Sequence, residues 1–312
     1  MAYFRLTDNM FGQTSSLRWQ IIKNADLYAA DSLLRENEGN YVGACSRFLT
    51  RGDSPVWVLR EKTKSVNTSS VNTGSVYNSC VKALVISSKS TLMPVLCGEK
   101  NIPSPDFLDN FTRKKNVHSI QGLTNEVSLL EKEMKRLGWI TADIFDYNLM
   151  TLDKLNKTQV KLKSDTEDKL FNLVLKKPQL TDIDAISPLQ AGYEKEEVVP
   201  KGSEFSPAAS RINTANIIAG GQILAAELNG RYIGKINVSA VSYTRFQVGG
   251  VYVHPDFRGL GVGRKMVFEF TSSLLRQNKG VTLFVKKTNT AARRLYTSLG
   301  FAEKGDYRIT YY

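Results

Sequence analysis

The sequence has few of the residues that build disulfide or metal sites. Among 312 residues there are three cysteines and two histidines. The number of cysteines is odd, and they are widely spaced, at Cys45, Cys80 and Cys97, without a CxxC pair. The two histidines, His118 and His254, also lie far apart in the sequence. This pattern argues against a disulfide framework, a structural zinc site and histidine-based metal chemistry. We therefore expect no metal.

The sequence also lacks a membrane or export signal. No apolar run approaches the roughly 18 residues that a membrane-spanning helix needs. The first residues do not combine a basic segment with an apolar stretch and a small-residue cleavage site. We therefore expect a cytoplasmic protein without a membrane partner.

What the chain does have is the composition of a globular protein with an excess of positive charge. Hydrophobic residues make up 42% and charged residues 23%, and the net charge is +12. A basic surface attracts polyanions, nucleic acid first among them. The lysines and arginines are spread along the chain rather than gathered in one block. This distribution argues against a nucleic-acid partner, and a solvated basic surface accounts for much of the excess.

The length predicts two domains. Residues 153–168 are polar and lysine-rich, so we place the boundary there, between an N-terminal α/β domain at 1–155 and a second domain at 169–312. Residues 61–80 hold three imperfect pentads rich in Ser, Asn and Thr, which are typical of a surface insertion.

Hydrophobic periodicity predicts the elements of both parts. In the first part we expect helices at 17–35, 41–49 and 122–137, and strands at 56–59, 81–86, 91–96 and 140–149. In the second part we expect strands at 170–175, 222–228, 232–240, 246–253 and 281–286, two short strands within 301–312, and helices at 181–197, 207–219, 262–278 and 290–299. Asn229-Gly230 predicts a tight hairpin. The fold class is α/β with a mixed sheet.

One segment of the second part carries a ligand-binding pattern. The apolar strand Val251-Tyr252-Val253 ends at His254-Pro255, and a glycine-rich turn then opens a helix. Glycines let the backbone approach a ligand. The first N–H groups of a helix lack internal partners and favour negative charge, so this turn suits a pyrophosphate. Neither the dinucleotide nor the P-loop spacing fits Arg258-x-x-Gly261-x-Gly263. His254 has a structural role in this interpretation.

A second pattern follows and supports a family resemblance. Asn289-x-x-Ala292-x-x-x-Tyr296-x-x-x-Gly300-Phe301 comes after the strand Leu283-Phe284-Val285. Together with Arg258-x-x-Gly261-x-Gly263, it resembles the two cofactor motifs of the GNAT N-acetyltransferase superfamily. The resemblance covers roughly residues 170–312, with its specific motifs at 246–301. More weakly, the whole chain is similar to bacterial predicted GNAT acetyltransferases with an N-terminal extension.

The resemblance implies acetyl-CoA as co-substrate and direct transfer of the acetyl group to an amine. The implied cofactor-binding residues are Val251, Tyr252, Val253, Arg258, Gly259, Leu260, Gly261, Val262, Gly263, Arg264, Asn289, Ala292 and Tyr296. The Tyr296 hydroxyl would protonate the departing thiolate. A bulge at Gly249-Gly250 would open the sheet for the thioester. Coenzyme A is itself a polyanion, which gives part of the net charge a use.

Several points stay open at this level. Glu227 is our first candidate for the general base, with Glu194, Glu197 and a base acting through water as alternatives. The acceptor is a small-molecule or peptide amine, and the basic charge favours neutral or anionic ones. The N-terminal part has a similar helix–strand order without the glycine loop, so it is either a degenerate second copy of the fold or an unrelated α/β domain. The rival function is a non-catalytic acyl-CoA-binding regulatory or nucleic-acid-associated module.

Overall fold

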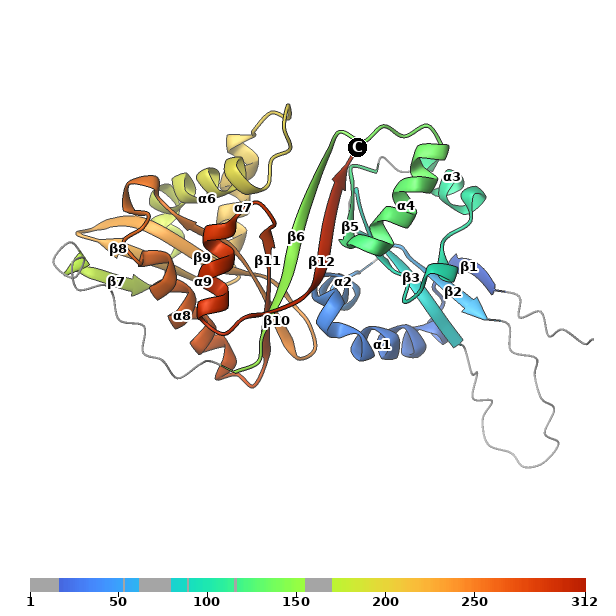
Figure 1. The fold of residues 1–312 in the computed structure, drawn as a ribbon, viewed down its shortest axis with the longest axis horizontal. Helices are drawn as coiled ribbons and strands as arrows, with labels where there is room; N and C mark the ends of the chain where they lie inside the picture. The colour runs from blue at the N-terminus through green and yellow to red at the C-terminus, as the bar shows by residue number, and fades with distance from the viewer. Residues whose placement is uncertain (1–16, 53, 62–79, 89, 115–116, 155–169) are drawn as a thin grey trace, which may run out of the picture.

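The computed structural model describes residues 17–52, 54–61, 80–88, 90–114, 117–154 and 170–312 (Figure 1). Most of the predicted insertion at 61–80 and of the predicted boundary at 153–168 lies outside these residues. The strands form one mixed sheet in the described part of the chain. Its order is β1-β2-β3-β4-β5-β12-β6-β11-β10-β9-β8-β7. The predicted α/β class with a mixed sheet is confirmed.

The elements of the first part are β1 (Leu17–Ile21), α1 (Leu27–Glu36), α2 (Glu38–Leu49), β2 (Val56–Glu61), β3 (Cys80–Ser88), β4 (Thr91–Val95), α3 (Pro105–Lys114), β5 (Ser119–Leu123), α4 (Thr124–Arg136) and β6 (Asp143–Leu152). Those of the second part are β7 (Leu173–Lys176), α6 (Ile183–Glu197), α7 (Pro207–Ala219), β8 (Ile223–Leu228), β9 (Arg231–Val241), β10 (Arg245–Val253), α8 (Val262–Leu275), β11 (Gly280–Lys286), α9 (Thr290–Ser298) and β12 (Ala302–Tyr311). Short 3-10 turns precede α1, α3, α6 and α8.

The two parts exchange their last strands at the middle of the sheet. β6 ends the first part, yet it pairs with β11 of the second part, from Leu152–Val281 to Tyr147–Lys286. β12 ends the second part and pairs with β5 of the first. β6 and β12 also pair with each other and cross the centre of Figure 1 side by side. The strand order is thus mirrored about the β12–β6 pair, as expected for two copies of one fold.

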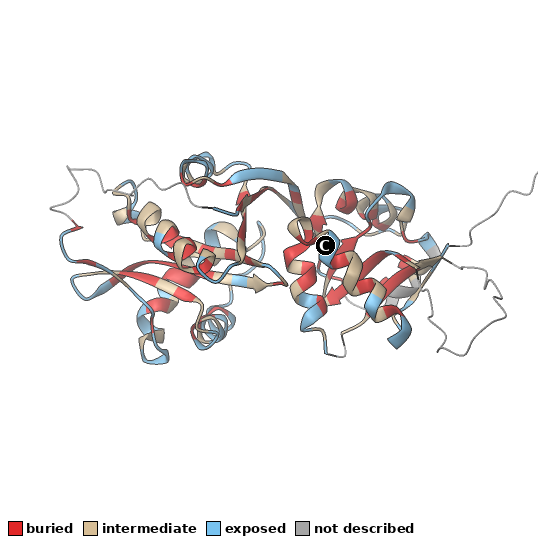
Figure 2. Ribbon diagram, turned by 90° about the horizontal axis from the view of Figure 1, so that it is seen from below, coloured by how far each residue is buried: buried red, intermediate tan, exposed pale blue. Residues whose placement is uncertain are grey.

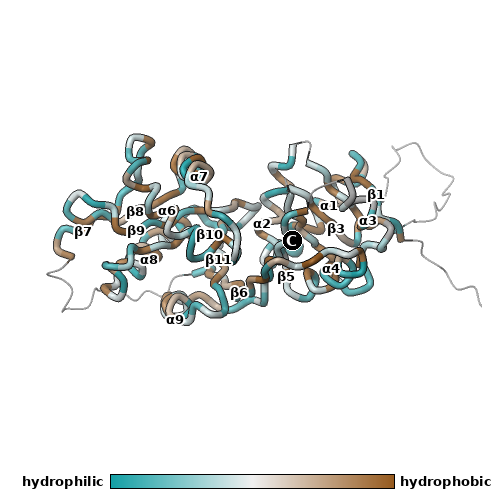
Figure 3. Tube along the Cα trace, turned by 90° about the horizontal axis from the view of Figure 1, so that it is seen from above, coloured by the Kyte–Doolittle hydropathy of each residue, from teal (hydrophilic) through white to brown (hydrophobic). Residues whose placement is uncertain are grey.

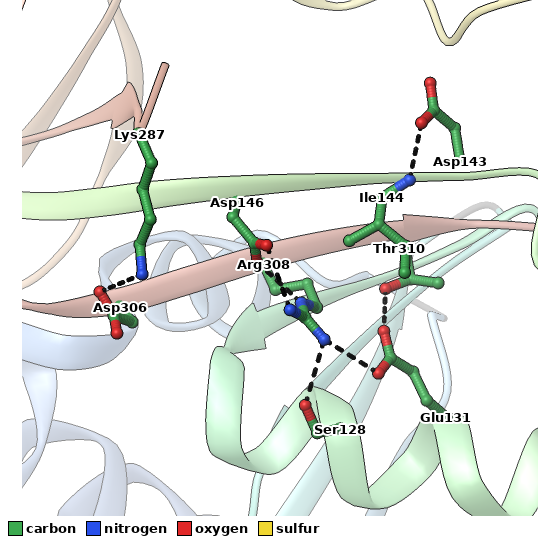
Figure 4. A network of polar contacts seen from close by, with 9 residues as sticks. All are labelled: Ser128, Glu131, Asp143, Ile144, Asp146, Lys287, Asp306, Arg308 and Thr310. Carbon is green, nitrogen blue, oxygen red and sulfur yellow. Dashed lines mark hydrogen bonds and ion pairs between the residues drawn. The ribbon is translucent and has the colours of Figure 1, made fainter. Parts of the chain in front are cut away.

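Polar contacts hold this junction together (Figure 4). On β12, the Arg308 guanidinium donates to both carboxylate oxygens of Asp146 on β6, at 2.8 and 3.1 Å, and to Glu131 on α4 at 3.2 Å. Thr310 donates to the same Glu131 carboxylate. Because Arg308 is only 20% exposed, solvent screens these contacts less than those of a surface pair. They bind β12 to both its neighbouring strand and the helix that covers it.

Buried residues line the sheet in both parts (Figure 2), and hydrophobic residues occur in both rather than in one (Figure 3). In the second part, Met266 and Phe270 of α8 pack on one face of the sheet. Ile186 and Leu189 of α6 pack on the other face with Tyr232. β9 and β10 are therefore covered on both sides, and a ligand can reach β10 only where the sheet itself opens.

Most predicted elements are present, and three segments differ. Residues 17–21 form a strand instead of the start of a helix, because they pair with β2 from Leu17–Glu61 to Ile21–Trp57. Residues 302–311 form one strand instead of two short ones. The shift in register between Glu303 and Gly305 lets β12 continue without a break. Helix α3 had no counterpart among the predicted elements.

Candidate active site

The sheet opens between two parallel strands of the second part. β10 and β11 pair from Arg245–Gly280 to Val248–Leu283, and in the register of these fully described strands no further pair follows, although both strands continue. On its other side, β10 has a bulge between Gly249 and Tyr252. This is the bulge expected at Gly249-Gly250. The backbone of β10 beyond Val248 is thereby left without a neighbouring strand on the β11 side.

Gly250 is required at this bulge. Its φ is +60°, in the left-handed region that residues with a side chain rarely adopt. A Cβ there would lie 2.1 Å from Asn237 Oδ1 and 2.5 Å from Lys235 Nζ. Both contacts are too short to exist, so the bulge could not keep this shape with another residue.

The glycine-rich turn directly follows β10 and ends at the start of α8. Gly261 caps the helix with φ +88°, and the Gly261 carbonyl accepts the first helical hydrogen bond, from the Lys265 N–H at 3.0 Å. The N–H groups of the first helical turn have no carbonyl four residues before them within the helix. Their partial positive charge makes this helix start suited to a phosphate.

Arg258, the first residue of the motif, binds protein groups. Its Nε donates to the Val253 carbonyl at 2.9 Å, and one terminal nitrogen lies 2.9 Å from each carboxylate oxygen of Glu196 on α6. Tyr252 OH also lies 3.3 Å from Glu196. The side chain of Arg258 thus fastens the turn to β10 and α6, a role that the motif spacing alone does not reveal.

A cavity of 510 Å³ runs along the open edge of β10. It extends from the glycine-rich turn past the bulge to α2 of the first part. Seven of the predicted cofactor-binding residues line it: Val251, Val253, Arg258, Gly263, Asn289, Ala292 and Tyr296. The remaining six do not: Tyr252, Gly259, Leu260, Gly261, Val262 and Arg264. Tyr252 points to the opposite face of β10, toward α6, and the side chain of Val262 is in the core.

Tyr296 lies on α9 and is 6% exposed. Asn289 begins this helix and accepts a hydrogen bond from the Ala292 N–H at 3.1 Å. Burial raises the pKa of Tyr296 well above its usual value, and the nearby Tyr193 and Glu197 add to the shift. The hydroxyl is therefore protonated over the whole physiological range. It can donate a proton but is not a base at neutral pH.

The structure brings one of the three candidate bases to the cavity. Glu197, at the end of α6, lines it, accepts a hydrogen bond from Asn289 Nδ2 at 3.3 Å and lies 3.5 Å from Lys286 Nζ. Glu227 lies on β8, separated from β10 by β9, and is paired with Lys176 outside the cavity lining. Glu194 accepts from Gln190 and Asn213 and is also outside the lining. The placement gives Glu227 no access to the site.

Two buried groups next to the bulge had no place in the sequence analysis. Lys235 on β9 is 0% exposed and donates to Asn237 Oδ1 at 2.9 Å. Burial lowers the pKa of Lys235 to about 7. Tyr193 on α6 lines the cavity, receives a hydrogen bond from the Gly250 N–H, and has its pKa raised to about 12 by burial. Only the folded arrangement reveals them, because Lys235 Nζ lies 5.1 Å from the centre of the Tyr193 ring although the two residues are on different elements.

The first part of the chain also contributes to the cavity wall. Its lining residues are Gly43, Ser46 and Arg47 on α2, Met93 on β4, Gln121 on β5 and Tyr147 on β6. Tyr307, Ile309 and Tyr311 come from the exchanged strand β12. None of these residues belongs to a recognisable motif, and sequence reasoning missed them.

The mixed sheet therefore opens between two parallel strands, next to a helix start suited to phosphate. Residues 219–303 match the family model described as an acetyltransferase (GNAT) domain. This part of the chain is a GNAT domain, and the resemblance expected from the motifs is confirmed.

Comparisons with individual proteins also point to the GNAT fold. An uncharacterized N-acetyltransferase of Archaeoglobus fulgidus is 32% identical over 83 residues, which cover 24% of this chain. The match spans 56% of the length of that curated relative. Among solved structures, a Drosophila protein superposes with a TM-score of 0.61 at 10% identity, over 94% of this chain and 98% of that one. A GCN5-related N-acetyltransferase from Sphaerobacter thermophilus gives 0.56 at 14% identity, over 94% of both chains. The fold likeness thus extends over both parts of the molecule.

The described residues lack two further features. They contain no group of three or more His, Cys, Asp or Glu side chains that could hold a metal ion. Within the same residues, no helix has the length and apolar character needed to cross a membrane.

Proposed function

We propose that the protein transfers an acetyl group from acetyl-CoA to an amine by direct attack. The observation that supports this most is the open edge of β10. From Gly249 to Val253 the backbone has no strand partner on the β11 side, runs along one cavity and leads to the phosphate-suited start of α8. Acetyl-CoA, with a pyrophosphate at one end and a thioester at the other, has the chemical groups that this arrangement can bind.

The residues of the chain then have distinct tasks. The N–H groups of the first turn of α8 and the glycine-rich turn hold the pyrophosphate. The free backbone of β10 binds the pantetheine arm, and an N–H at the bulge polarises the acetyl carbonyl, a type of stabilisation worth about 3 kcal/mol per donor. These tasks need close backbone approach, which Gly250 and Gly263 allow.

Transfer requires the movement of two protons. The amine nitrogen forms a bond to the acetyl carbon, and the bond from that carbon to sulfur breaks. The departing thiolate takes a proton from the Tyr296 hydroxyl. The proton lost by the amine goes to Glu197, directly or through water, because Glu197 is the candidate carboxylate in the cavity wall.

The test is release of free thiol from acetyl-CoA with a mixture of amines, peptides and polyamines, together with calorimetric titration of acetyl-CoA alone. We expect binding and amine-dependent thiol release. Binding without release for any amine would support the rival, a non-catalytic acyl-CoA-binding module. Absence of acetyl-CoA binding would overturn both hypotheses, the transferase and the non-catalytic binding module.

A further inference from the structure

The cavity is longer than the cofactor motifs account for. In the proposed site the pyrophosphate lies at the start of α8 and the thioester lies at the bulge. The stretch of the cavity between Gly249 and α2 then has no part in binding the cofactor. Gln247 on β10, Ser239 on β9, and Gly43 and Arg47 on α2 line this stretch. If the proposed function holds, it is the place left for the acceptor amine.

The charged side chains of the cavity differ in whether they already have a partner within the protein. Four charged side chains line the whole cavity: Arg47, Glu197, Arg258 and Lys286. Arg258 is paired with Glu196, and Lys286 with Glu197. Among the described residues, the structure gives Arg47 neither an ion pair nor a hydrogen bond. Arg47 is therefore the cation of this wall that remains available to a ligand.

The position of Arg47 follows from the seating of α2 on the β9–β10 hairpin. A Cβ on Gly43 would lie 3.4 Å from Gln247 Oε1, and Ser46 Oγ lies 3.4 Å from the Val241 N–H. Arg47 comes four residues after Gly43, on the same side of the helix. The exposed side chain of Arg47 thus extends from the helix that borders the far end of the cavity.

A second group of this stretch lacks a partner. Gln247 Oε1 is buried and accepts no hydrogen bond, while its amide nitrogen donates to Ser239 Oγ at 3.1 Å. Leaving a buried acceptor unpaired is costly. Gln247 and Gly249 both line the cavity, so Gln247 lies close to the bulge. An N–H group of a ligand near the bulge would satisfy this oxygen.

We infer that the acceptor is a small amine carrying an anionic oxygen group, with its nitrogen near Gln247 and its anion on Arg47. The inference rests on the proposed function. A carboxylate and a phosphate share the chemistry that a guanidinium recognises. A polyamine or a lysine-rich peptide, in contrast, would bring further positive charge toward Arg47.

Matched acceptors test this directly. The kcat/KM would be measured for L-amino acids against their L-amino-acid amides, and for O-phosphoethanolamine against ethanolamine. We expect the wild type to prefer the anionic member of at least one pair type, and the preferred type tells carboxylate from phosphate. Arg47→Gln should lower kcat/KM for the preferred anionic amines about 10- to 100-fold, with little change for their neutral partners.

Two more variants separate charge recognition from damage to the helix. Arg47→Lys keeps the charge without the bidentate geometry and should restore part of the loss. Arg51→Gln, two residues after the end of α2 and outside the cavity lining, removes the same charge and should leave kcat/KM for both kinds of acceptor unchanged. A loss that is the same for anionic and neutral amines would overturn the inference.

A wild-type preference for neutral amines, or no turnover of any acceptor in the panel, would also overturn it. The failure of the proposed function is recognised separately. In that case calorimetry on the same preparation would show no binding of acetyl-CoA, or no amine of any kind would release thiol.

Discussion

The β10–β11 and β4–β5 pairs occupy matching places in the mirrored sheet, and in both of them the pairing stops before the strands end. We call β10–β11 the open pair, because its gap faces the cavity, and β4–β5 the closed pair, because protein side chains fill its gap. Both are parallel, and β4 pairs with β5 at Thr91–Ser119 and Leu92–Ile120. Beyond that point, a Cβ on Gly122 of β5 would lie 3.3 Å from the Pro94 ring of β4. The end of β4 is therefore packed against its neighbour, whereas the end of β10 faces a cavity.

The backbone donors differ in the same way. At the end of β4, the N–H groups of Leu96 and Cys97 donate to Glu126 Oε1, at 3.0 and 2.9 Å, and Tyr41 OH donates to the same oxygen at 2.7 Å. Glu126 is 3% exposed, and burial raises its pKa. A side chain of the protein thus takes donors of the kind that β10 leaves for a ligand. The same sheet design thus forms the proposed binding site in one part and a structural core in the other.

The largest expected effect is on the open pair. Gly261→Val places a β-branched residue at φ +88° and distorts the start of α8. The loss of two charge-assisted backbone hydrogen bonds to the pyrophosphate, at about 2 kcal/mol each, predicts roughly 1,000-fold weaker acetyl-CoA binding by calorimetry.

The matched control is Gly98→Ala, which follows β4 and also has a positive φ, of +153°. It introduces backbone strain at the closed pair, so it should lower stability without changing acetyl-CoA affinity. Normal affinity in Gly261→Val would count against the motif assignment.

A substitution at the closed pair should instead lower the stability of the protein and leave acetyl-CoA affinity unchanged. Glu126→Ala leaves the buried Leu96 N–H, the partly buried Cys97 N–H and the buried Tyr41 hydroxyl without their acceptor, which should lower the free energy of unfolding by about 3 kcal/mol. The measurement is urea denaturation, with acetyl-CoA titration of the folded variant beside it. Unchanged stability, or a marked change in cofactor affinity, would break the distinction between the two strand pairs.

Tyr296→Phe tests whether the proposed site beside the open pair catalyses transfer in addition to binding acetyl-CoA. Without the hydroxyl, the departing thiolate lacks its acid, so turnover should fall about 100-fold. Affinity for acetyl-CoA should change little, because the ring keeps its packing against Phe301. Tyr232→Phe, on the other face of the sheet, is the control and should keep its turnover. Equal turnover in both variants would remove Tyr296 from the mechanism.

The comparison also explains what the sequence could predict. Each cofactor motif lies within a single strand–turn–helix unit, the first with Gly261 and Gly263 and the second with Asn289 and Tyr296. The spacing of these residues along the chain was therefore enough to predict the site. Arg47, by contrast, reaches the cavity only through the seating of α2 on the β9–β10 hairpin, and no local pattern encodes that contact.

The fold follows the same division. The hairpin at Asn229-Gly230, with φ of +50° and +81°, was predictable from two residues. The exchange of β6 and β12 was not, because it depends on which partner each strand meets. The location of Glu227 outside the cavity lining has the same reason: its position along the strand was predictable, but its separation from β10 by β9 was not.

The smallest expected effect concerns Lys235, under the bulge of the open pair. The corresponding strand of the closed pair, β3, carries buried Leu84 and Ile86. Between about pH 7 and 10.5 the folded protein holds Lys235 as a neutral amine, while the unfolded chain holds it as an ammonium. Folding therefore releases a proton in this window, and wild-type stability should rise with pH through it.

Lys235→Met removes that proton-linked cost but leaves Asn237 Oδ1 without its donor, so the net gain at neutral pH should be only about 1 kcal/mol. The sharper readout is the pH dependence. The stability of the variant minus that of the wild type should be greatest near pH 7 and decrease steadily toward pH 10.5 in urea denaturation. Leu84→Met on β3 provides the comparison, and its difference from the wild type should not vary with pH. A difference for Lys235→Met that is flat across this range would mean that the amine stays charged under the bulge, and would contradict the lowered pKa of Lys235.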